Sequence, residues 1–229
     1  MNQVYIIEAL RTPFGSFGGT LADVPATELA ATVARALIER SGIDPATLNQ
    51  FIAEQVVPAG CGQAPGRIAI RKAGIPDTVP AMAINKACGS GLKSMMLVAD
   101  GIRLGEDHLG IAGGMENMSL APYVMPAART GLRMGHGKLV DSMIQDGLWD
   151  MVNDFHMGMS NELCSAKYQV TREDQDRYAA ESYRRALAAV QSGRFQDEIV
   201  PVDIPQRKGE PKQFSRDECP RDTNFAVLA

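Results

Sequence analysis

The sequence lacks the features that would place the protein in a membrane or on a nucleic acid. No apolar run approaches the roughly 20 residues that a membrane-spanning helix needs. The chain opens without a basic leader and apolar core, so we interpret its N-terminus as unprocessed and expect a cytoplasmic protein. The formal net charge is −4 and the basic residues are scattered. Nucleic-acid binding needs a basic face, so we expect neither a nucleic acid nor a membrane as partner.

Cysteine is scarce and dispersed. The four cysteines lie far apart and form no CxxC pair, which indicates neither a zinc site nor a disulfide framework. We therefore expect no bound metal. Three of them, Cys61, Cys164 and Cys219, have no glycine-flanked helix start beside them, and we interpret them as structural. Cys88 is different.

Cys88 lies between an apolar run at residues 79–84, typical of a buried strand, and a predicted helix. The helix is indicated by apolar residues at helical spacing: Leu92, Met95, Met96, Ala99 and Ile102. Gly89 and Gly91 leave room for a turn and for a ligand. A helix N-terminus favours a thiolate, and its amides could hold an oxyanion. A buried structural cysteine is the alternative, and the pattern alone leaves both open.

Nearly half of the 229 residues are apolar, enough for one large core or two smaller ones. Predicted strands alternate with predicted helices up to residue 112. The strands are 4–7, 51–57, 79–84 and 108–112, and the helices are 27–41, 66–72 and the one after Cys88. This alternation predicts an α/β fold with a mostly parallel sheet and right-handed crossovers. Cys88 follows the carboxyl end of a strand, where such sheets bind ligands.

The character of the chain changes after about residue 120. Residues 121–159 are rich in Met, Gly and Pro, and eight of the twelve methionines lie between positions 115 and 159. Methionine here indicates either adaptable core packing or a loose surface that closes over an apolar ligand arm. Thr171 and Asp174 have capping-box spacing and predict the start of a helix that ends near Gly193. A strand is predicted at 198–202.

Residues 85–93 resemble the signature around the acyl-accepting cysteine of thiolases, the acetyl-CoA acetyltransferase family. Further segments match in family order and spacing: 8–19, 62–66, 113–119, 156–158 and 171–202. The resemblance covers the N-terminal part of a thiolase only. It implies an incomplete N-terminal core domain at residues 1–120. It also implies an inserted loop domain that covers coenzyme A, likewise incomplete, at residues 121–229.

The resemblance also implies a reaction. Cys88 attacks an acyl-CoA thioester with help from its own backbone amide, and the acyl-enzyme then undergoes Claisen condensation or its reverse. His156 and Met157 are expected at the pantetheine arm and acyl pocket, and Arg221 near the adenine end. A coenzyme A thioester is the substrate, and no cofactor is expected. Segments 131–135 and 146–150 favour a short-chain acyl group. The full-length protein is expected to be a homo-oligomer, a dimer or tetramer.

Some positions depart from the thiolase pattern. Glu54 and Gln55 stand where Gly-Asn is usual, and residues 161–163 read Asn-Glu-Leu instead of Ala-Glu-Asn. The chain ends at Ala229, before the segment that carries the family's activating histidine and second cysteine. We therefore predict that this chain is inactive alone. The alternatives are a non-catalytic coenzyme A-binding or interaction module and a ketoacyl synthase.

Overall fold

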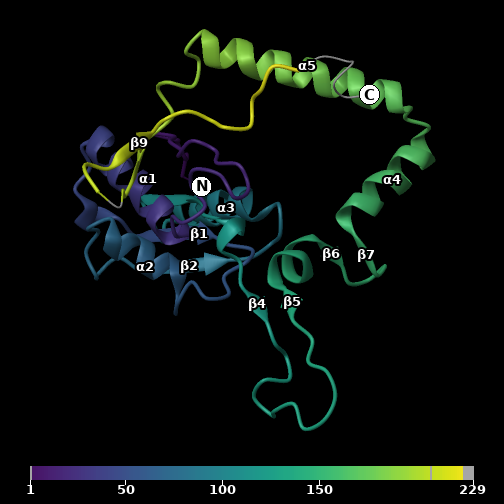
Figure 1. Ribbon diagram of the computed structural model, residues 1–229. Helices are drawn as coiled ribbons and strands as arrows, with labels where there is room; N and C mark the ends of the chain where they lie inside the picture. Colours follow the sequence, from purple (N-terminus) through teal and green to yellow (C-terminus); the bar gives the residue numbers. More distant parts are fainter. Residues whose placement is uncertain (1, 207, 224–229) are drawn as a thin grey trace.

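The computed structural model describes residues 2–206 and 208–223 (Figure 1). Its centre is a three-stranded parallel sheet of order β2-β1-β3. The strands are β1 (Gln50–Glu54), β2 (Ala81–Ile84) and β3 (Gly110–Gly114). The parallel sheet predicted from the strand–helix alternation is confirmed.

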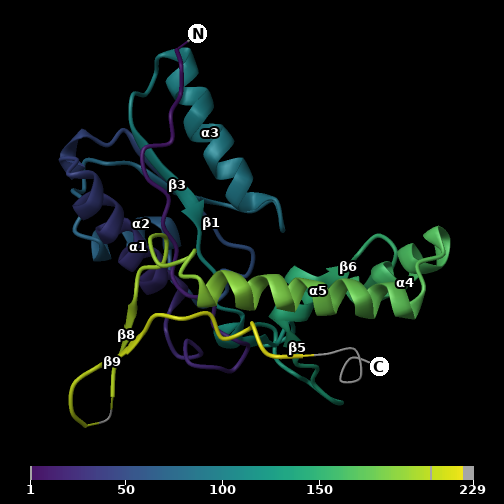
Figure 2. The ribbon, with the colours of Figure 1, turned by 90° about the horizontal axis from the view of Figure 1, so that it is seen from above.

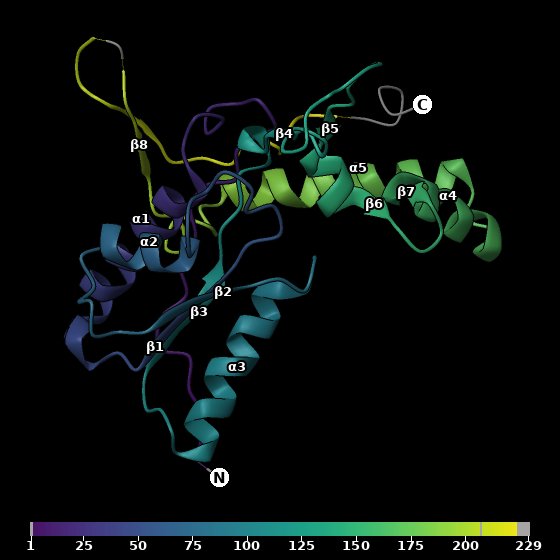
Figure 3. The same cartoon turned by 90° about the horizontal axis from the view of Figure 1, so that it is seen from below.

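Three helices cover the sheet: α1 (Ala26–Ser41), α2 (Pro65–Lys72) and α3 (Ser90–Leu104). Figures 2 and 3 show α1 and α2 on one face of the sheet and α3 on the other. The helix ends follow local chemistry, because Gly42 closes α1 in the left-handed conformation and Pro65 opens α2. Each predicted helix of this part is present.

The main core lies between α1, α2 and the sheet. Alanines of α1 pack there with large side chains from β1, α2 and the segment before β2, namely Phe51, Ile70 and Val79. The alanine face lets α1 lie close to its neighbours. This side of the sheet therefore holds most of the buried apolar surface.

Helix α3 packs on the sheet through small residues, whereas its large apolar residues face outward. Ser90, Ser94, Val98 and Gly101 are buried, while Leu92 is 71% exposed. A Cβ at Gly110 would lie 2.8 Å from Val98 Cγ1, so glycine on β3 is what admits the helix this closely. The spacing of apolar residues correctly predicted a helix, but the large residues in that pattern, Leu92, Met95 and Met96, lie on its exposed face.

The strand predicted at residues 4–7 is wrong. This segment is extended but belongs to no strand, and Tyr5, Ile6 and Ile7 are each more than 60% exposed. A strand requires a partner for its backbone groups. In the described chain, neither edge of the sheet pairs with this segment, and Asn2 instead bonds to the carbonyls of Ile102 and Arg103.

Beyond residue 114 the described chain forms short hairpins and helical segments. The hairpins are β4 (Tyr123–Val124) with β5 (Val140–Asp141) and β6 (Trp149–Asp150) with β7 (Phe155–His156). This part also holds a 3-10 helix (Met118–Leu120), a π-helix (Met143–Leu148), α4 (Met157–Tyr168) and α5 (Arg172–Gln191), whereas a further 3-10 helix (Pro45–Thr47) precedes β1. In Figure 1 the β4–β5 hairpin and the two helices project away from the sheet layers.

The start of α5 was predicted correctly. Thr171 is its N-cap, and Thr171 and Asp174 form the reciprocal capping box. The sequence analysis did not predict α4. Its N-cap is a histidine, His156, and this residue type is not a usual start signal.

The end of the described chain returns to the N-terminal part. Strands β8 (Val202–Ile204) and β9 (Lys212–Phe214) pair antiparallel, and Val202 packs with Leu21, Val24 and Leu29. The strand predicted at 198–202 is shifted, because Ile199 makes only an isolated bridge with Arg11. The domain boundary at residue 120 stays a prediction.

Candidate active site

Cys88 is exposed in the turn between the end of β2 and the start of α3. The preceding residue, Ala87, has a φ of 46°, a left-handed conformation that is uncommon for any residue with a Cβ. Such a conformation costs about 1–3 kcal/mol and persists only where surrounding contacts hold it. The turn is therefore supported by its neighbours.

Two polar side chains hold this turn. The fully buried Ser90 hydroxyl accepts the Lys86 N–H at 2.6 Å and donates to the Ala87 carbonyl at 2.6 Å. Asn85 Oδ1 accepts the Ala87 N–H at 2.9 Å, and Asn85 Nδ2 donates to the Val56 carbonyl at 3.2 Å. The Ala87 peptide is thus held on both sides while the next side chain, Cys88, stays exposed.

Cys88 also lies at the N-terminal end of α3. Gly89 is the N-cap and supplies no side-chain cap, and the first turn of α3, all of it described, carries no acidic residue. Helix N-termini stabilise anions through their amides and partial positive charge. The amides at this place could hold a developing oxyanion.

Two polar side chains in the segment after β3, Glu116 and Asn117, form hydrogen bonds with backbone groups of other loops. Glu116 Oε2 accepts the backbone N–H groups of Val56 at 2.8 Å and Val57 at 3.1 Å. Asn117 Nδ2 donates to three carbonyls in the loop before α1, those of Leu21, Ala22 and Val24. Sequence reasoning gave these two residues no role, although polar side chains directly after a strand were a usable signal.

Glu54, the last residue of β1, is a second acidic residue in this part of the structure. Burial, and then the negative charge of Glu116, raise the pKa of Glu54 above its usual range, against a smaller opposite effect of the Ser90 hydroxyl. Among the described residues, neither Glu54 Oε2 nor Glu116 Oε1 has a hydrogen-bond partner, although both atoms are buried. Glu54 was noted in the sequence as a departure from the thiolase pattern, and it lies beside the candidate nucleophile's turn.

The structure places His156 and Met157 at the start of α4. His156 Nδ1 accepts the Gly158 N–H at 3.0 Å, so this nitrogen caps the helix, and Met157 is 39% exposed. Arg221 is exposed, and its guanidinium lies over the Tyr183 ring of α5, 5.7 Å from the centroid.

Within the described residues, no hydrogen bond, ion pair or ring contact joins any two of Cys88, His156, Met157 and Arg221. The main packing partners of α3 are β1 and β3, whereas that of α4 is β7. The four predicted residues therefore do not form one contact cluster, and their roles stay predictions. The same described ranges contain no group of three or more His, Cys, Asp or Glu residues that could hold a metal ion.

A salt-bridge cluster that sequence reasoning missed joins Arg11 to Glu198 and Asp217. Arg11 donates to both carboxylate oxygens of Asp217, at 2.7 and 3.0 Å, and to Glu198 at 2.7 Å. Glu218 accepts the Ser16 N–H at 2.7 Å. About 200 positions separate these partners, so no local pattern could indicate the contact.

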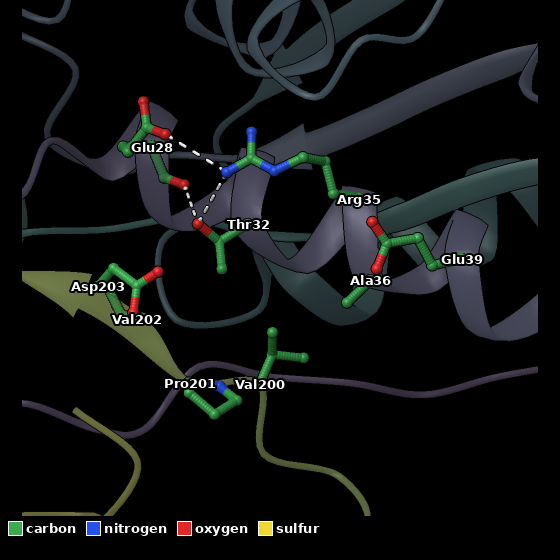
Figure 4. Close-up of a pocket in the computed structure, with 9 residues that line it drawn as sticks. All are labelled: Glu28, Thr32, Arg35, Ala36, Glu39, Val200, Pro201, Val202 and Asp203. Atoms are coloured by element: carbon green, nitrogen blue, oxygen red, sulfur yellow. Dashed lines mark hydrogen bonds and ion pairs between the residues drawn. The ribbon is translucent and has the colours of Figure 1, made fainter. Parts of the chain in front are cut away.

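A separate polar cavity of about 280 Å³ lies between α1 and residues 200–203 (Figure 4). Glu28, Arg35 and Asp203 are among its lining residues. The pKa of Glu28 is lowered, chiefly by a hydrogen bond from Lys72. None of the four predicted site residues lines this cavity.

Comparison with known proteins agrees with this fold. Residues 4–228 match the family described as "Thiolase, N-terminal domain". The chain is 58% identical, over its whole length, to an acetyl-CoA acetyltransferase of Pseudomonas aeruginosa, of which it covers 58%. Over 96% of its length it is 52% identical to an acetyl-CoA acetyltransferase of Cupriavidus necator, of which it covers 56%.

A solved structure gives the same result. The acetyl-CoA acetyltransferase of Bacillus anthracis superposes with a TM-score of 0.93 at 36% identity, over 96% of this chain and 56% of that one. The chain thus spans a little over half the length of the relatives it matches. Its parallel sheet, its covering helices and these matches together show that the chain belongs to the thiolase family and corresponds to the N-terminal domain.

Proposed function

We propose that this chain is the part of an acyl-CoA acyltransferase that carries the acyl-accepting nucleophile, Cys88. The observation that carries the proposal is the exposed thiol at the N-terminus of α3, on a turn held in a left-handed conformation at Ala87. The names of the relatives, acetyl-CoA acetyltransferases, support an acetyl-CoA or short-chain acyl-CoA substrate.

In the proposed reaction the Cys88 thiolate attacks the thioester carbonyl carbon. A carbon–sulfur bond to Cys88 forms, the bond to coenzyme A breaks, and the coenzyme A thiolate leaves and takes up a proton. The carbonyl oxygen carries the negative charge in between, and amides at the start of α3 would stabilise it. The deprotonated alpha carbon of a second acetyl-CoA then attacks the acyl carbon and releases the Cys88 thiolate.

We further propose that residues 121–229 cover the coenzyme A arm, with His156 and Met157 at the pantetheine and Arg221 near the adenine. An apolar arm that slides over an adaptable surface fits the exposed methionines of this part, which are Met125, Met134, Met151, Met157 and Met159. Coenzyme A is here a substrate, and we propose no cofactor.

The described histidines are His108, His136 and His156, and none bonds to the Cys88 turn. We therefore propose that the 229 residues alone are acylated slowly and do not complete the condensation. The complete enzyme is proposed to be a cytoplasmic homo-oligomer. Among the described helices, none has the length and apolar character needed to cross a bilayer.

The test is the mass of the chain after incubation with acetyl-CoA. We expect one added acetyl group on the peptide that contains Cys88, and none in Cys88→Ser. Cys164→Ser is the matched control, because Cys164 is also an exposed cysteine, on α4, and its replacement should leave the acetylation unchanged. Coenzyme A binding without acetylation would contradict the proposal and support a non-catalytic coenzyme A-binding module.

A further inference from the structure

The side chain of Lys86 lies along the turn that presents Cys88. The Lys86 carbonyl accepts the Gly89 N–H at 3.2 Å, which closes a four-residue turn with Ala87 and Cys88 at its centre. The two ends of such a turn are less than about 7 Å apart. Lys86 Cδ is 4.0 Å from the position that a Cβ on Gly89 would take. The lysine stem therefore folds back toward Gly89, the residue bonded to Cys88.

The amine of Lys86 is available for chemistry. Lys86 is exposed, and within the described ranges no hydrogen bond or ion pair holds its side chain. Lys72, by contrast, donates to Glu28 at 2.9 Å. The first turn of α3, next to Lys86, carries no acidic residue that could pair with it. An unpaired amine on a flexible four-carbon stem can move over the atoms around Gly89, which include the thiol of Cys88.

We propose that Lys86 is a self-acylation site that takes the acyl group from acyl-Cys88 by transfer from sulfur to nitrogen. The neutral Lys86 amine attacks the thioester carbonyl carbon and forms a carbon–nitrogen bond. The carbon–sulfur bond to Cys88 breaks, and the sulfur leaves with the electron pair and takes up the proton that the nitrogen loses. The products are an amide on Lys86 and a free Cys88 thiol. This inference rests on the proposed function, because acyl-Cys88 is the donor.

Two features favour this transfer in the 229-residue chain. The donor and the acceptor belong to one turn, so the reaction is intramolecular and gains from proximity. The proposed function also leaves acyl-Cys88 without an efficient second step, so a slow transfer has time to occur. An amide is more stable than a thioester, and the acyl group therefore stays on Lys86.

Lys93 is the other lysine close to Cys88 in sequence, and it supplies the matched control. It lies inside α3, five positions after Cys88, where its backbone N–H bonds to the Gly89 carbonyl at 3.0 Å. Only Lys86 belongs to the turn itself. We therefore expect Lys86 to be the acceptor.

The test is tryptic mapping of the chain after incubation with one equivalent of acetyl-CoA. Trypsin cuts after an unmodified lysine but not after an acetylated one. Acetylation of Lys86 therefore gives one joined peptide, 73–93, in place of peptides 73–86 and 87–93. We expect the joined peptide to carry one acetyl group that survives hydroxylamine, which cleaves thioesters but not amides.

Three variants decide whether Cys88 is the donor. In Cys88→Ala, acetylation of Lys86 should fall about tenfold or more, because only direct attack on acetyl-CoA remains. Blocking Cys88 with iodoacetamide in the wild type should have the same effect, which keeps the test independent of the folding of that variant. Lys93→Arg should leave acetylation of Lys86 unchanged, and in Lys86→Arg the acetyl group should stay on Cys88. Equal acetylation of Lys86 with and without the Cys88 thiol, or transfer to Lys93 instead, would overturn the proposal.

The same experiment separates this proposal from the proposed function. Acetyl-Cys88 without acetyl-Lys86 in the wild type overturns the transfer alone. A chain whose Cys88 stays unmodified by acetyl-CoA, even in Lys86→Arg, contradicts the proposed function. In that case p-nitrophenyl acetate, an activated ester that acetylates exposed thiols without coenzyme A recognition, loads Cys88 instead. The comparison of wild type with Cys88→Ala then decides the transfer.

Discussion

At the scale of single residues, the chemistry of this chain depends on how the Ala87 peptide is held. Ser90 and Asn85 each bond to the Ala87 peptide, and both lie within a few positions of Cys88. Their effect is to keep a left-handed alanine in place next to an exposed thiol. Removing the side chain of Ser90 or Asn85 should therefore change both the reactivity of Cys88 and the free energy of unfolding, and the two effects can be measured separately.

We predict that Ser90→Ala lowers the free energy of unfolding by about 1–3 kcal/mol, because it leaves the Lys86 N–H and the Ala87 carbonyl without their side-chain partner. It should also slow alkylation of Cys88. Denaturant unfolding and peptide mass spectrometry measure the two effects.

Ser94→Ala is the control for this prediction. Ser94 lies one helical turn further along α3 and is equally buried, and its hydroxyl donates to the Gly91 and Gly113 carbonyls instead of the turn. It should lose comparable stability while Cys88 keeps its rate. Equal slowing in both variants would show that Ser90 acts only through general stability.

At the scale of elements, the close approach of α3 and β3 decides which face of the helix is buried. Val98 meets β3 at Gly110, while Leu92, Met95 and Met96 remain on the outer face. Small residues on both elements exclude the large ones from this contact. The result is a broad apolar surface on the outside of α3.

We predict that Gly110→Ala destabilises the fold by about 1–3 kcal/mol, because the new Cβ would lie 2.8 Å from Val98 Cγ1 and push the helix away. Gly113→Ala, on the same strand, has no atom within 4 Å of the added Cβ and should change the stability little. Thermal unfolding of the two variants is the measurement. Similar losses for both would mean that α3 does not depend on this contact.

At the scale of the whole molecule, the ionised side chains of Asp217 and Glu218 bind residues 11–20 of the N-terminal segment. Burial acts to raise the pKa of Asp217, but the Arg11 guanidinium and the Phe14 N–H outweigh it, so this pKa is lowered. The Thr20 hydroxyl, followed by the Ser16 N–H, lowers the pKa of Glu218. Both carboxylates are therefore favoured in the folded state.

A carboxyl whose pKa is lowered by folding adds stability above its unfolded pKa, and this stability is lost as pH falls through the folded value. We predict that proteases begin to cut residues 208–223 only below about pH 4 in the wild type. In Asp217→Asn, which cannot form the ion pair, cleavage should already occur near neutral pH. Asp222→Asn, an exposed acid of the same segment, should behave like the wild type. A wild-type cleavage profile in Asp217→Asn would refute the role of this pair.

What the sequence alone determined is local. The Gly42 end of α1, the capping box at Thr171 and the place of Cys88 between strand and helix each depend on residues a few positions apart. Backbone hydrogen bonding and side-chain periodicity act over that range, so a pattern can indicate them. The thiolase resemblance, which the comparisons confirm, was also readable from short segments.

The tertiary structure decided what depends on distant parts of the chain meeting. The inward face of α3, the lack of a strand partner for residues 4–7 within the described chain and the effect of the Glu116 charge on Glu54 all follow from how the sheet assembles. The pairing of Arg11 with Asp217 joins positions 206 apart. The periodicity of a sequence indicates an apolar face, but it does not indicate which element packs against that face. The partner of a charged residue is likewise known only once folding has brought distant parts of the chain together.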